Sequence, residues 1–535
     1  MTKIKLETPK EIIEIIKKLQ KNKFEAFLVG GCVRDLILNK TPSDWDITTN
    51  ANPEEIQNIF KHTFYENDFG TVGVVNDEID KKIKELENKI LCNTCETINK
   101  QGLHTVSQDN TKKQEDVSRE TLKNLKSLKT IEITPYRIES SYSNNRHPDN
   151  IKFSDNIEDD LQRRDFTINA LAYNPLSHEL LDLFNGISDL NQKIIKTVGD
   201  PEKRFNEDAL RILRAVRFSA QLNFDISKET KNSIIKNKNL LKNISNERIR
   251  DEFIKILQTK NAIDAFFLAH ELKILDYISK DLTNSIGVTQ GGAHKYDVFE
   301  HLLKTMQHAI DKDWSFDIRL AGLFHDIAKP HTARWSEKKN GNTFYGHEVV
   351  GEKIAKKNLE RLNFPKKTID KVLTLIRWHM FFSDPDKITL TAVRRIIRNV
   401  GEENIWDLIK LRICDRIGMG RPKEKPYRLR QYQAMMDEAM RSPISVKDLK
   451  INGDILINEM GFQPGKKIGL ILNALMGITL YEPEKNNLKF LKEKIEEYKN
   501  LSDQELEKLA ETGKEKIFEE ENKELKEIHK KHKVN

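Results

Sequence analysis

The sequence predicts an α+β fold, in which a small mixed β-sheet near the N-terminus is followed by helices alone. Short runs rich in β-branched residues, such as 70–75 and 130–138, indicate strands. From about residue 176 onward, apolar residues recur at helical spacing. A chain of 535 residues is also too long for one hydrophobic core, so we expect several domains.

The first elements alternate between helix and strand. Residues 8–22 carry isoleucine and leucine at helical spacing after a Thr-Pro start, which predicts a helix. FEAFLVGG (24–31) predicts a strand that ends in glycines, and DWDITT (44–49) predicts a second strand. Pro53 then opens a helix that runs to Phe60.

A polar insertion, residues 76–130, separates two strands that should form a hairpin. It has no Phe, Trp, Tyr or Pro and is rich in Lys, Asn, Glu and Gln. This length is far outside the usual range for a hairpin loop. We expect some helix near 80–92 and 118–128, and partial disorder in the rest.

The net charge of +7 is a mild basic excess, which weakly favours a polyanionic partner. The cysteine content and the N-terminus indicate a cytoplasmic protein. Four cysteines make no disulfide scaffold, and the lone pair Cys92 and Cys95, with His104 as the single nearby candidate, is a poor zinc site. The N-terminus has no apolar signal segment, and the longest apolar stretch (468–481) is too short to span a bilayer, so no membrane partner is expected.

Two aspartates flank a tryptophan in the predicted strand 44–49. Residues two apart on a strand face the same side, so Asp44 and Asp46 should present their carboxylates together. Adjacent carboxylates repel unless a cation neutralises them, and clustered carboxylate oxygens suit Mg²⁺ bridged to phosphate. Glu132, on a facing strand, would complete a two-metal site.

Glycine and arginine lie just upstream of this pair. Gly30 and Gly31 let the backbone approach a triphosphate closely, and Arg34 can neutralise it. An isolated DxD pair is a weak signal. Its combination with GGxVRD at this spacing is a strong one.

Four ordered motifs give the chain a resemblance to a known family. GGCVRD…DWDI, RRDFTINALAY (163–173), EDALRILRAVRF (207–218) and NERIRDEFIKIL (246–257) resemble the bacterial class II tRNA nucleotidyltransferases, which are the CCA-adding enzymes and their poly(A) polymerase relatives. The resemblance implies a nucleotidyltransferase palm as the head, followed by helical neck, body and tail.

The resemblance also implies roles for individual residues. Asp44, Asp46 and Glu132 would be catalytic, with the aspartates binding two Mg²⁺ ions that activate the primer 3′-hydroxyl and stabilise pyrophosphate. The implied nucleotide-binding positions are Gly30, Gly31, Arg34, Arg164, Asp165, Asn169, Asp208, Arg211, Arg214 and Arg217.

Asp208 and Arg211 are three residues apart in a predicted helix. On spacing alone they form an ordinary intrahelical ion pair. Cytosine and adenine, however, each present an amino donor beside a ring acceptor, and a carboxylate with a guanidinium complements this pair. Uracil and guanine present a carbonyl oxygen in place of the amino group, so two acceptors would face each other. The resemblance favours this second interpretation, because the family's EDxxR motif is its protein template for CTP and ATP.

Among the family's activities we expect complete CCA addition to tRNA. FGTVGVV (69–75) lacks the signature of gammaproteobacterial poly(A) polymerases, and residues 139–161, with Arg146, retain a flexible loop that CC-only enzymes tend to lose. Poly(A) synthesis and partial CC- or A-addition remain alternatives. A catalytically degenerate protein that only binds RNA is an alternative of another class.

Histidines and aspartates recur between about residues 290 and 420. HDIAKP resembles the HD-superfamily phosphohydrolases, which implies metal-dependent hydrolysis of cyclic phosphates or phosphomonoesters at RNA ends. Imidazole and carboxylate ligands together suit Mn, Fe, Co, Ni or Zn, and six of them favour a two-metal site. The alternative is a helical tRNA-binding body with a vestigial site. The candidate ligands are His301, His325, Asp326, His347, His379 and Asp415.

These observations divide the chain into four expected parts. They are a head (1–175, including the insertion 76–130), a neck with the nucleotide-selecting helix (176–265), an HD-type domain (266–425) and an RNA-binding helical tail (426–535). Lys466, Lys467 and the basic stretch 421–430 are candidate phosphate contacts. The oligomeric state is left open.

Overall fold

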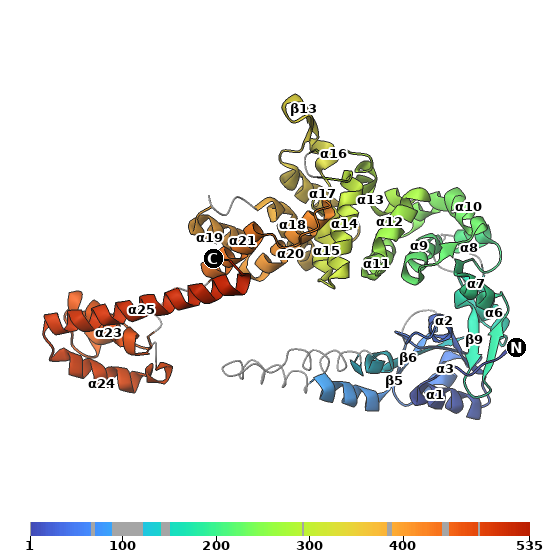
Figure 1. Cartoon of the computed structure of the whole chain (residues 1–535). Helices are drawn as coiled ribbons and strands as arrows, with labels where there is room; N and C mark the ends of the chain where they lie inside the picture. Colours follow the sequence, from blue (N-terminus) through green and yellow to red (C-terminus); the bar gives the residue numbers. More distant parts are fainter. Residues whose placement is uncertain are drawn as a thin grey trace. The chain divides into compact units, whose positions relative to one another are not determined.

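A computed structural model describes most of the chain (Figure 1). It forms two compact units, Met1–Ile286 with Lys357–Pro365, and Gly287–Lys356 with Lys366–Asn535. Helices predominate in both, and the one large sheet among the described residues lies in the first unit, as the α+β prediction requires. The described residues are 2–65, 70–87, 121–122, 124–140, 150–291, 294–381, 388–440, 449–479 and 482–534.

The sheet of the first unit has eight strands in the order β1-β10-β9-β2-β3-β6-β5-β4. Its β3 and β6 are parallel neighbours, and its other described neighbours are antiparallel. The strands are β1 (Thr2–Lys3), β2 (Ala26–Val29), β3 (Asp46–Thr49), β4 (Thr63–Tyr65), β5 (Val72–Val75), β6 (Thr130–Pro135), β9 (Leu171–Asn174) and β10 (Glu179–Asp182).

The predicted hairpin around the insertion is confirmed. β5 and β6 are antiparallel, and Val75 lies opposite Thr130, so the insertion leaves and re-enters the sheet at neighbouring points. Residues 77–87 are helical, as expected for the first part of 80–92. Residues 88–120, which include Cys92, Cys95 and His104, lie outside the described residues.

Helices of the head pack on the sheet through apolar stripes. The predicted N-terminal helix is α1 (Lys10–Lys21), which buries Ile12, Ile15, Ile16 and Leu19 at helical spacing. α2 (Gly31–Ile37) follows β2 directly. α3 (Pro53–Ile59) begins with a capping box between Asn52 and Glu55, which satisfies two backbone donors at its start.

The chain is mostly helical after residue 176, as predicted, but a few short strands interrupt the helices. β10 joins the large sheet, and β11 (Ile194–Ile195) pairs with β12 (Asp225–Ile226). Strands of two to four residues are too short for periodicity to reveal. The remaining helices of this unit are α6 (Ile157–Gln162), α7 (Gly186–Gln192), α8 (Pro201–Glu207), α9 (Leu210–Leu222), α10 (Lys228–Asn237), α11 (Asn246–Gln258), α12 (Ala262–Glu271) and α13 (Leu275–Asn284).

The second unit is built on helices, with one small hairpin of β13 (Arg334–Ser336) and β14 (Gly341–Thr343). Gly322 lets α15 approach α14 closely, because a Cβ there would lie 3.3 Å from the Cα of Met306. Helices of this part are α14 (Val298–Asp311), α15 (Phe316–Phe324), α16 (Lys329–Thr332), α17 (His347–Arg361), α18 (Lys366–Trp378), α19 (Leu390–Val400), α20 (Glu402–Gly418) and α21 (Tyr427–Met440). The end of α17, from Lys357 onward, belongs to the first unit.

Four C-terminal helices share a separate apolar cluster. They are α22 (Gly453–Asn458), α23 (Lys466–Thr479), α24 (Leu488–Lys499) and α25 (Asp503–His532). The apolar stretch 468–481 belongs mainly to α23, which buries Ile471 and Leu475 completely, as predicted. In the part of the chain that the structure describes, no helix combines the length and apolarity needed to cross a membrane.

Candidate functional site

A glycine turn at the end of β2 opens a space between charged side chains. Gly30 has a φ of +82°, which favours glycine, and it precedes the first turn of α2. A Cβ at Gly30 would lie 3.0 Å from an Arg164 guanidinium nitrogen and 3.7 Å from Asp46 Oδ2. A Cβ at Gly31 would lie 3.6 Å from a guanidinium nitrogen of Arg34. Because Gly30 and Gly31 have no side chains, the backbone there stays open beside Arg34, Arg164 and Asp46. We call this place the glycine cradle.

Asp46 and Glu132 are brought together as predicted. They are register partners on the parallel strands β3 and β6, so they occupy the same level of the sheet. Asp44 differs from the prediction, because the strand begins at Asp46 and Asp44 lies in the preceding bend. The Asp44 side chain is exposed and accepts a hydrogen bond from Ser43 Oγ at 2.8 Å, while Asp46 is half-buried.

Arg34 and Asn169 connect two of the predicted motifs. The buried Arg34 donates from Nη1 to Asn169 Oδ1 at 2.8 Å and from Nε to Asp35 at 2.8 Å. Asn169 in turn donates to Asp165 Oδ1 at 3.2 Å. Arg214 reaches the other oxygen of Asp165 at 2.7 Å. The four predicted residues thus form one hydrogen-bonded chain.

Two buried aspartates hold these arginines. Burial would raise the pKa of Asp165, but Arg214 outweighs it and lowers this pKa to about 2. Burial likewise acts on Asp160, where the Arg163 and Arg164 guanidinium groups prevail and lower the pKa. Asp160 accepts from Arg164 Nη2 at 3.0 Å. Both carboxylates are therefore charged, and they fix the arginines near the glycine cradle.

The prediction that Asp208 and Arg211 share one helix face is wrong. α8 ends at Glu207, Asp208 is extended (φ −142°, ψ 104°), and α9 begins at Leu210. The Asp208 carboxylate accepts from the backbone N–H of Leu210 at 3.0 Å, so it caps the new helix instead of continuing the old one. Arg211 pairs with Glu207 at 2.8 Å.

Asp208 has a partner that the sequence did not indicate. Arg248, at the start of α11, donates to both carboxylate oxygens, at 3.0 Å and 2.7 Å. Such a bidentate pair fixes the plane of a carboxylate. On the same helix, the buried Glu252 accepts from Arg217 Nε at 2.6 Å and lies 3.8 Å from Arg214. The motif NERIRDEF carries both residues, but its spacing does not reveal what they contact.

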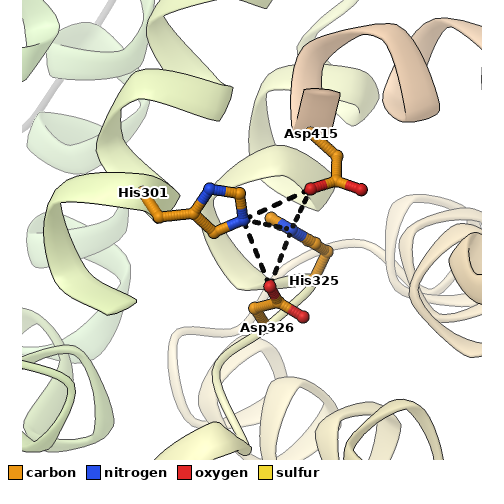
Figure 2. Close-up of side chains that lie close together, drawn as sticks. All are labelled: His301, His325, Asp326 and Asp415. Atoms are coloured by element: carbon orange, nitrogen blue, oxygen red, sulfur yellow. Dashed lines mark hydrogen bonds and ion pairs between the residues drawn. The ribbon is translucent and has the colours of Figure 1, made fainter. Parts of the chain in front are cut away.

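A second cluster of polar side chains lies inside the other unit. His301, His325, Asp326 and Asp415 are each at most 5% exposed, and their ligand-type atoms converge on one point (Figure 2). His301 Nε2 lies 3.1 Å from His325 Nε2, 3.1 Å from Asp326 Oδ2 and 3.4 Å from Asp415 Oδ1. α14, the end of α15 and α20 supply these side chains.

Two further histidines meet the other oxygen of Asp326. His347 Nε2 lies 3.1 Å and His379 Nε2 3.5 Å from Asp326 Oδ1, and the two nitrogens are 3.3 Å apart. Asp326 therefore belongs to both groups and could bridge two ions. All six predicted residues come together, although they are separated by more than a hundred positions in the chain.

Hydrogen bonds to backbone carbonyls orient these imidazoles. His347 Nδ1 lies 2.6 Å from the carbonyl of Phe344, and His379 Nδ1 lies 2.7 Å from that of Ile376. A carbonyl accepts, so each Nδ1 carries a proton and each Nε2 is turned toward the other ring and toward Asp326. Two imidazole nitrogens 3.3 Å apart beside a carboxylate are the arrangement that a shared proton or a bound cation stabilises. The donor set therefore fits a metal ion.

The electrostatics of the first group indicate the same need for positive charge. Burial would lower the pKa of His325, but Asp326 and Asp415 outweigh it and raise this pKa to about 10. A proton held this tightly occupies the place that a metal ion would take. Lys329, three residues after Asp326, is buried and ion-pairs with it. Lys329 was not among the predicted residues, although HDIAK places it three residues after Asp326.

Some predicted features fall outside the described residues. Arg146 and the rest of residues 141–149 of the loop 139–161 are among them, so the expected role of this loop stays a prediction. In the tail, Lys466 pairs with Glu507 at 2.5 Å, and Lys467 donates to the carbonyl of Lys499 at 3.2 Å. Both lysines are thus engaged within the protein.

Relatives of known function cover nearly the whole chain. The CCA-adding enzyme of Lactobacillus delbrueckii subsp. bulgaricus is 32% identical over 484 residues, which are 90% of this chain and 96% of that protein. The chain belongs to the CCA-adding enzyme family. The family member from Ligilactobacillus salivarius is 28% identical over 502 residues, 91% of this chain and 98% of that protein.

Domain and fold comparisons agree with this family. Sequence-family models match residues 26–119 and 90–196 (Poly A polymerase head domain), 223–286 (Probable RNA and SrmB- binding site of polymerase A) and 298–420 (HD domain). The fold is similar to that of the Bacillus stearothermophilus CCA-adding enzyme in complex with CTP, with a TM-score of 0.54 and 23% identity over 92% of this chain and 99% of that one.

Proposed function

We propose that this chain adds CCA to the 3′ end of tRNA, using CTP and ATP. The observation that carries the proposal is the preformed cradle of Gly30, Arg164 and Asp46 beside Glu132, in a chain that aligns with 96% of a CCA-adding enzyme. We propose a cytoplasmic location for this reaction. The four parts proposed above, with their boundaries at 175, 265 and 425, are the head, neck, HD-type domain and tail of such an enzyme.

Asp44, Asp46 and Glu132 are the proposed metal-binding carboxylates. The glycine cradle and the neighbouring carboxylates fit Mg²⁺ on a triphosphate, because carboxylate oxygens suit Mg²⁺ and the two arginines can pair with the phosphates. Bound Mg²⁺ supplies activation of the attacking 3′-hydroxyl and charge stabilisation on the departing pyrophosphate. Asp44 is exposed in a bend, so it can turn toward an arriving nucleotide.

The arginines around the cradle hold the triphosphate. Arg164 already borders the space that a Gly30 side chain would fill, and Asp160 fixes its orientation. Arg34, Arg214 and Asn169 are joined through Asp165, so they keep their positions before a nucleotide arrives. Preorganised donors of this kind lower the cost of binding and of charge development.

Asp208 and Arg211 are the proposed base-selecting residues. The carboxylate accepts from the amino group of cytosine or adenine, and the guanidinium donates to the ring acceptor. Arg248 holds the Asp208 carboxylate in plane, and Glu207 holds Arg211. A mismatched carbonyl facing the carboxylate costs several kcal/mol, or roughly a 10⁴-fold discrimination.

Incubation of the protein with tRNA transcripts tests this function. Transcripts that end at the discriminator base, at C, at CC and at CCA are supplied with each nucleotide separately and together. We expect C, then C, then A, and no extension of the CCA end. Long adenosine tails would instead indicate a poly(A) polymerase, arrest after CC or addition of A alone a partial enzyme, and no incorporation an RNA-binding protein.

We propose a second activity, metal-dependent phosphohydrolysis, for the buried histidine cluster. The observation that favours it is the convergence of six buried histidine and aspartate side chains, in which the Nε2 atoms of His347 and His379 lie 3.3 Å apart. His301, His325, Asp326 and Asp415 would hold one ion, and Asp326, His347 and His379 the other. Nitrogen and oxygen donors favour Mn, Fe, Co or Ni, which would polarise a phosphate ester and activate water.

Hydrolysis of 2′,3′-cyclic AMP tests this second activity. We expect turnover after loading with Mn, Co or Ni, and its loss in His325→Ala. The matched control is His308→Ala, a histidine on α14 outside the cluster. A purified protein without transition metal that stays inactive after each metal is added would show that the site is vestigial.

A further inference from the structure

Highly exposed apolar side chains lie near the histidine cluster along the chain. Among the large apolar residues that the structure describes, the four most exposed are Tyr345 (77%), Phe518 (66%), Trp335 (65%) and Met380 (55%). Three of them, Trp335, Tyr345 and Met380, lie in the HD domain on segments that lead to or from its ligands, and we call these three the apolar rim. Apolar side chains held in water at one place mark a binding surface.

Two residues of the apolar rim are close neighbours of buried ligands. Met380 directly follows His379, which is 2% exposed, and Tyr345 precedes His347, which is 6% exposed, by two residues. Two residues span at most about 7 Å, so the backbone passes from a buried ligand to an exposed apolar side chain over a very short distance. The histidine cluster therefore lies directly beneath the surface that carries these two side chains.

The third residue of the rim lies on the hairpin of β13 and β14, which stands out from the helices beside α16 (Figure 1). Trp335 and Asn342 are register partners, so their side chains lie on the same face of this hairpin. The Asn342 side chain donates to the carbonyl of Thr289 at 3.1 Å, which joins the hairpin to the loop before α14. The face that carries Trp335 is therefore the face turned toward this loop.

Lys329 connects the same loop and hairpin with the metal ligands. Its buried ammonium group ion-pairs with Asp326, donates to Gln290 Oε1 at 2.5 Å and lies 5.5 Å from the ring centre of Phe344. Gln290 belongs to the loop before α14, and Phe344 is the chain neighbour of Tyr345. A cation at the inner end and aromatic faces at the outer end suit a ligand that carries a phosphate at one end and a flat ring at the other.

From this arrangement we infer that the apolar rim stacks the base of a nucleoside phosphate whose phosphate lies at the histidine cluster. Only one ribose separates a base from its phosphate, which agrees with the short distance along the chain from Tyr345 and Met380 to the ligands. Three side chains cover too little surface for a stable protein partner, which buries about 800 Å² on each side, whereas one aromatic face is enough for a base. The inference rests on the proposed phosphohydrolase and gives it a substrate class, nucleotides or RNA ends in preference to esters without a base.

A double variant and a pair of substrates test the apolar rim. The metal-loaded protein receives 2′,3′-cyclic AMP or glycerol 1,2-cyclic phosphate, which has the same five-membered cyclic ester and no base. In Trp335→Ala with Tyr345→Ala, kcat/KM for cyclic AMP should fall about fivefold to a hundredfold, as for the loss of one stacked base. The value for the glycerol ester should not change. Trp335→Phe with Tyr345→Phe keeps both aromatic faces and should retain most of the activity.

The matched control is Tyr65→Ala with Phe518→Ala, which removes two similarly exposed aromatic rings outside the HD domain and should hydrolyse both substrates like the wild type. Binding is measured separately through the fluorescence of Trp335, taken as the difference between the wild type and Trp335→Leu. Adenosine 2′-monophosphate should quench this fluorescence, and glycerol 2-phosphate should not.

Three results would overturn the inference. They are an unchanged or equal loss of activity on the two substrates in the rim variant, the same loss in the control variant, and no quenching by the nucleotide. Quenching by the nucleotide in a protein that hydrolyses neither substrate would support the rim as a base-binding site and contradict only the proposed phosphohydrolase.

Discussion

The two candidate sites neutralise their carboxylates in opposite ways. In the head and neck, Asp160, Asp165 and Asp208 already pair with arginines of the chain. In the HD domain, Asp326 contacts four histidines, two of which bring their Nε2 atoms within 3.3 Å of each other. We therefore expect the first site to be a preformed surface that receives its metal together with the nucleotide. We expect the second to be a buried ligand set that needs a resident metal.

The largest expected effect is loss of nucleotide addition in Asp46→Ala. Asp46 faces Glu132 and the glycine cradle, so its removal should lower the rate of CTP incorporation about a thousandfold or more. Asp46 is half-buried at a strand end, so the melting temperature should change little. Cyclic AMP hydrolysis should be kept. Near-normal incorporation by this variant would remove the distinction between the sites.

Metal retention separates the two sites next. After dialysis against a chelator and addition of Mg²⁺ alone, nucleotide addition should return fully, because its metal enters from solution. Hydrolysis of 2′,3′-cyclic AMP should stay at least about a hundredfold lower until Mn, Co or Ni is restored. Elemental analysis should find bound transition metal in Asp46→Ala and very little in Asp326→Ala. Equal metal contents would contradict the comparison.

Arg248→Ala tests whether a paired carboxylate is a better selector than a free one. Without the bidentate partner the Asp208 side chain can rotate, so misincorporation of UTP against CTP should rise about tenfold to a hundredfold. Asp208→Ala should broaden the choice further and lower the rate. Arg248→Lys keeps the positive charge but cannot bind both carboxylate oxygens as a guanidinium does. Its misincorporation rate should therefore lie between those of the wild type and Arg248→Ala. Unchanged selectivity in all three would show that this helix region does not choose the base.

The smallest expected effect is that of deleting residues 80–127. Val75 and Thr130 are already paired across β5 and β6, so a short turn can join them. CCA addition should stay within about twofold of the wild type, and hydrolysis should be unaffected. A folded deletion protein that cannot add the terminal adenosine would show that the insertion takes part in catalysis.

The types of residue in the motifs were a better guide to the candidate sites than the spacing of residues along a helix. Glu132 could be assigned across the insertion because β-branched residues on both sides marked two strands of one sheet. The six HD ligands could be assigned because HDIAKP and the order of the histidines and aspartates around it resemble the HD superfamily. Asp208 was predicted to lie inside a helix, but it caps the start of one. The sequence around an aspartate does not by itself distinguish these two positions. Arg248 was missed because only tertiary packing brings α11 to Asp208.

The parallel pairing of β3 with β6 has a consequence for the newly made protein. Asp46 is synthesised 86 residues before its partner Glu132, so at typical elongation rates it waits about 4 to 17 s for that residue to be made. The interior strand β2 also needs β9, which is made later still. The nascent chain therefore has no complete transferase centre until most of the head has left the ribosome, and the insertion lengthens that interval.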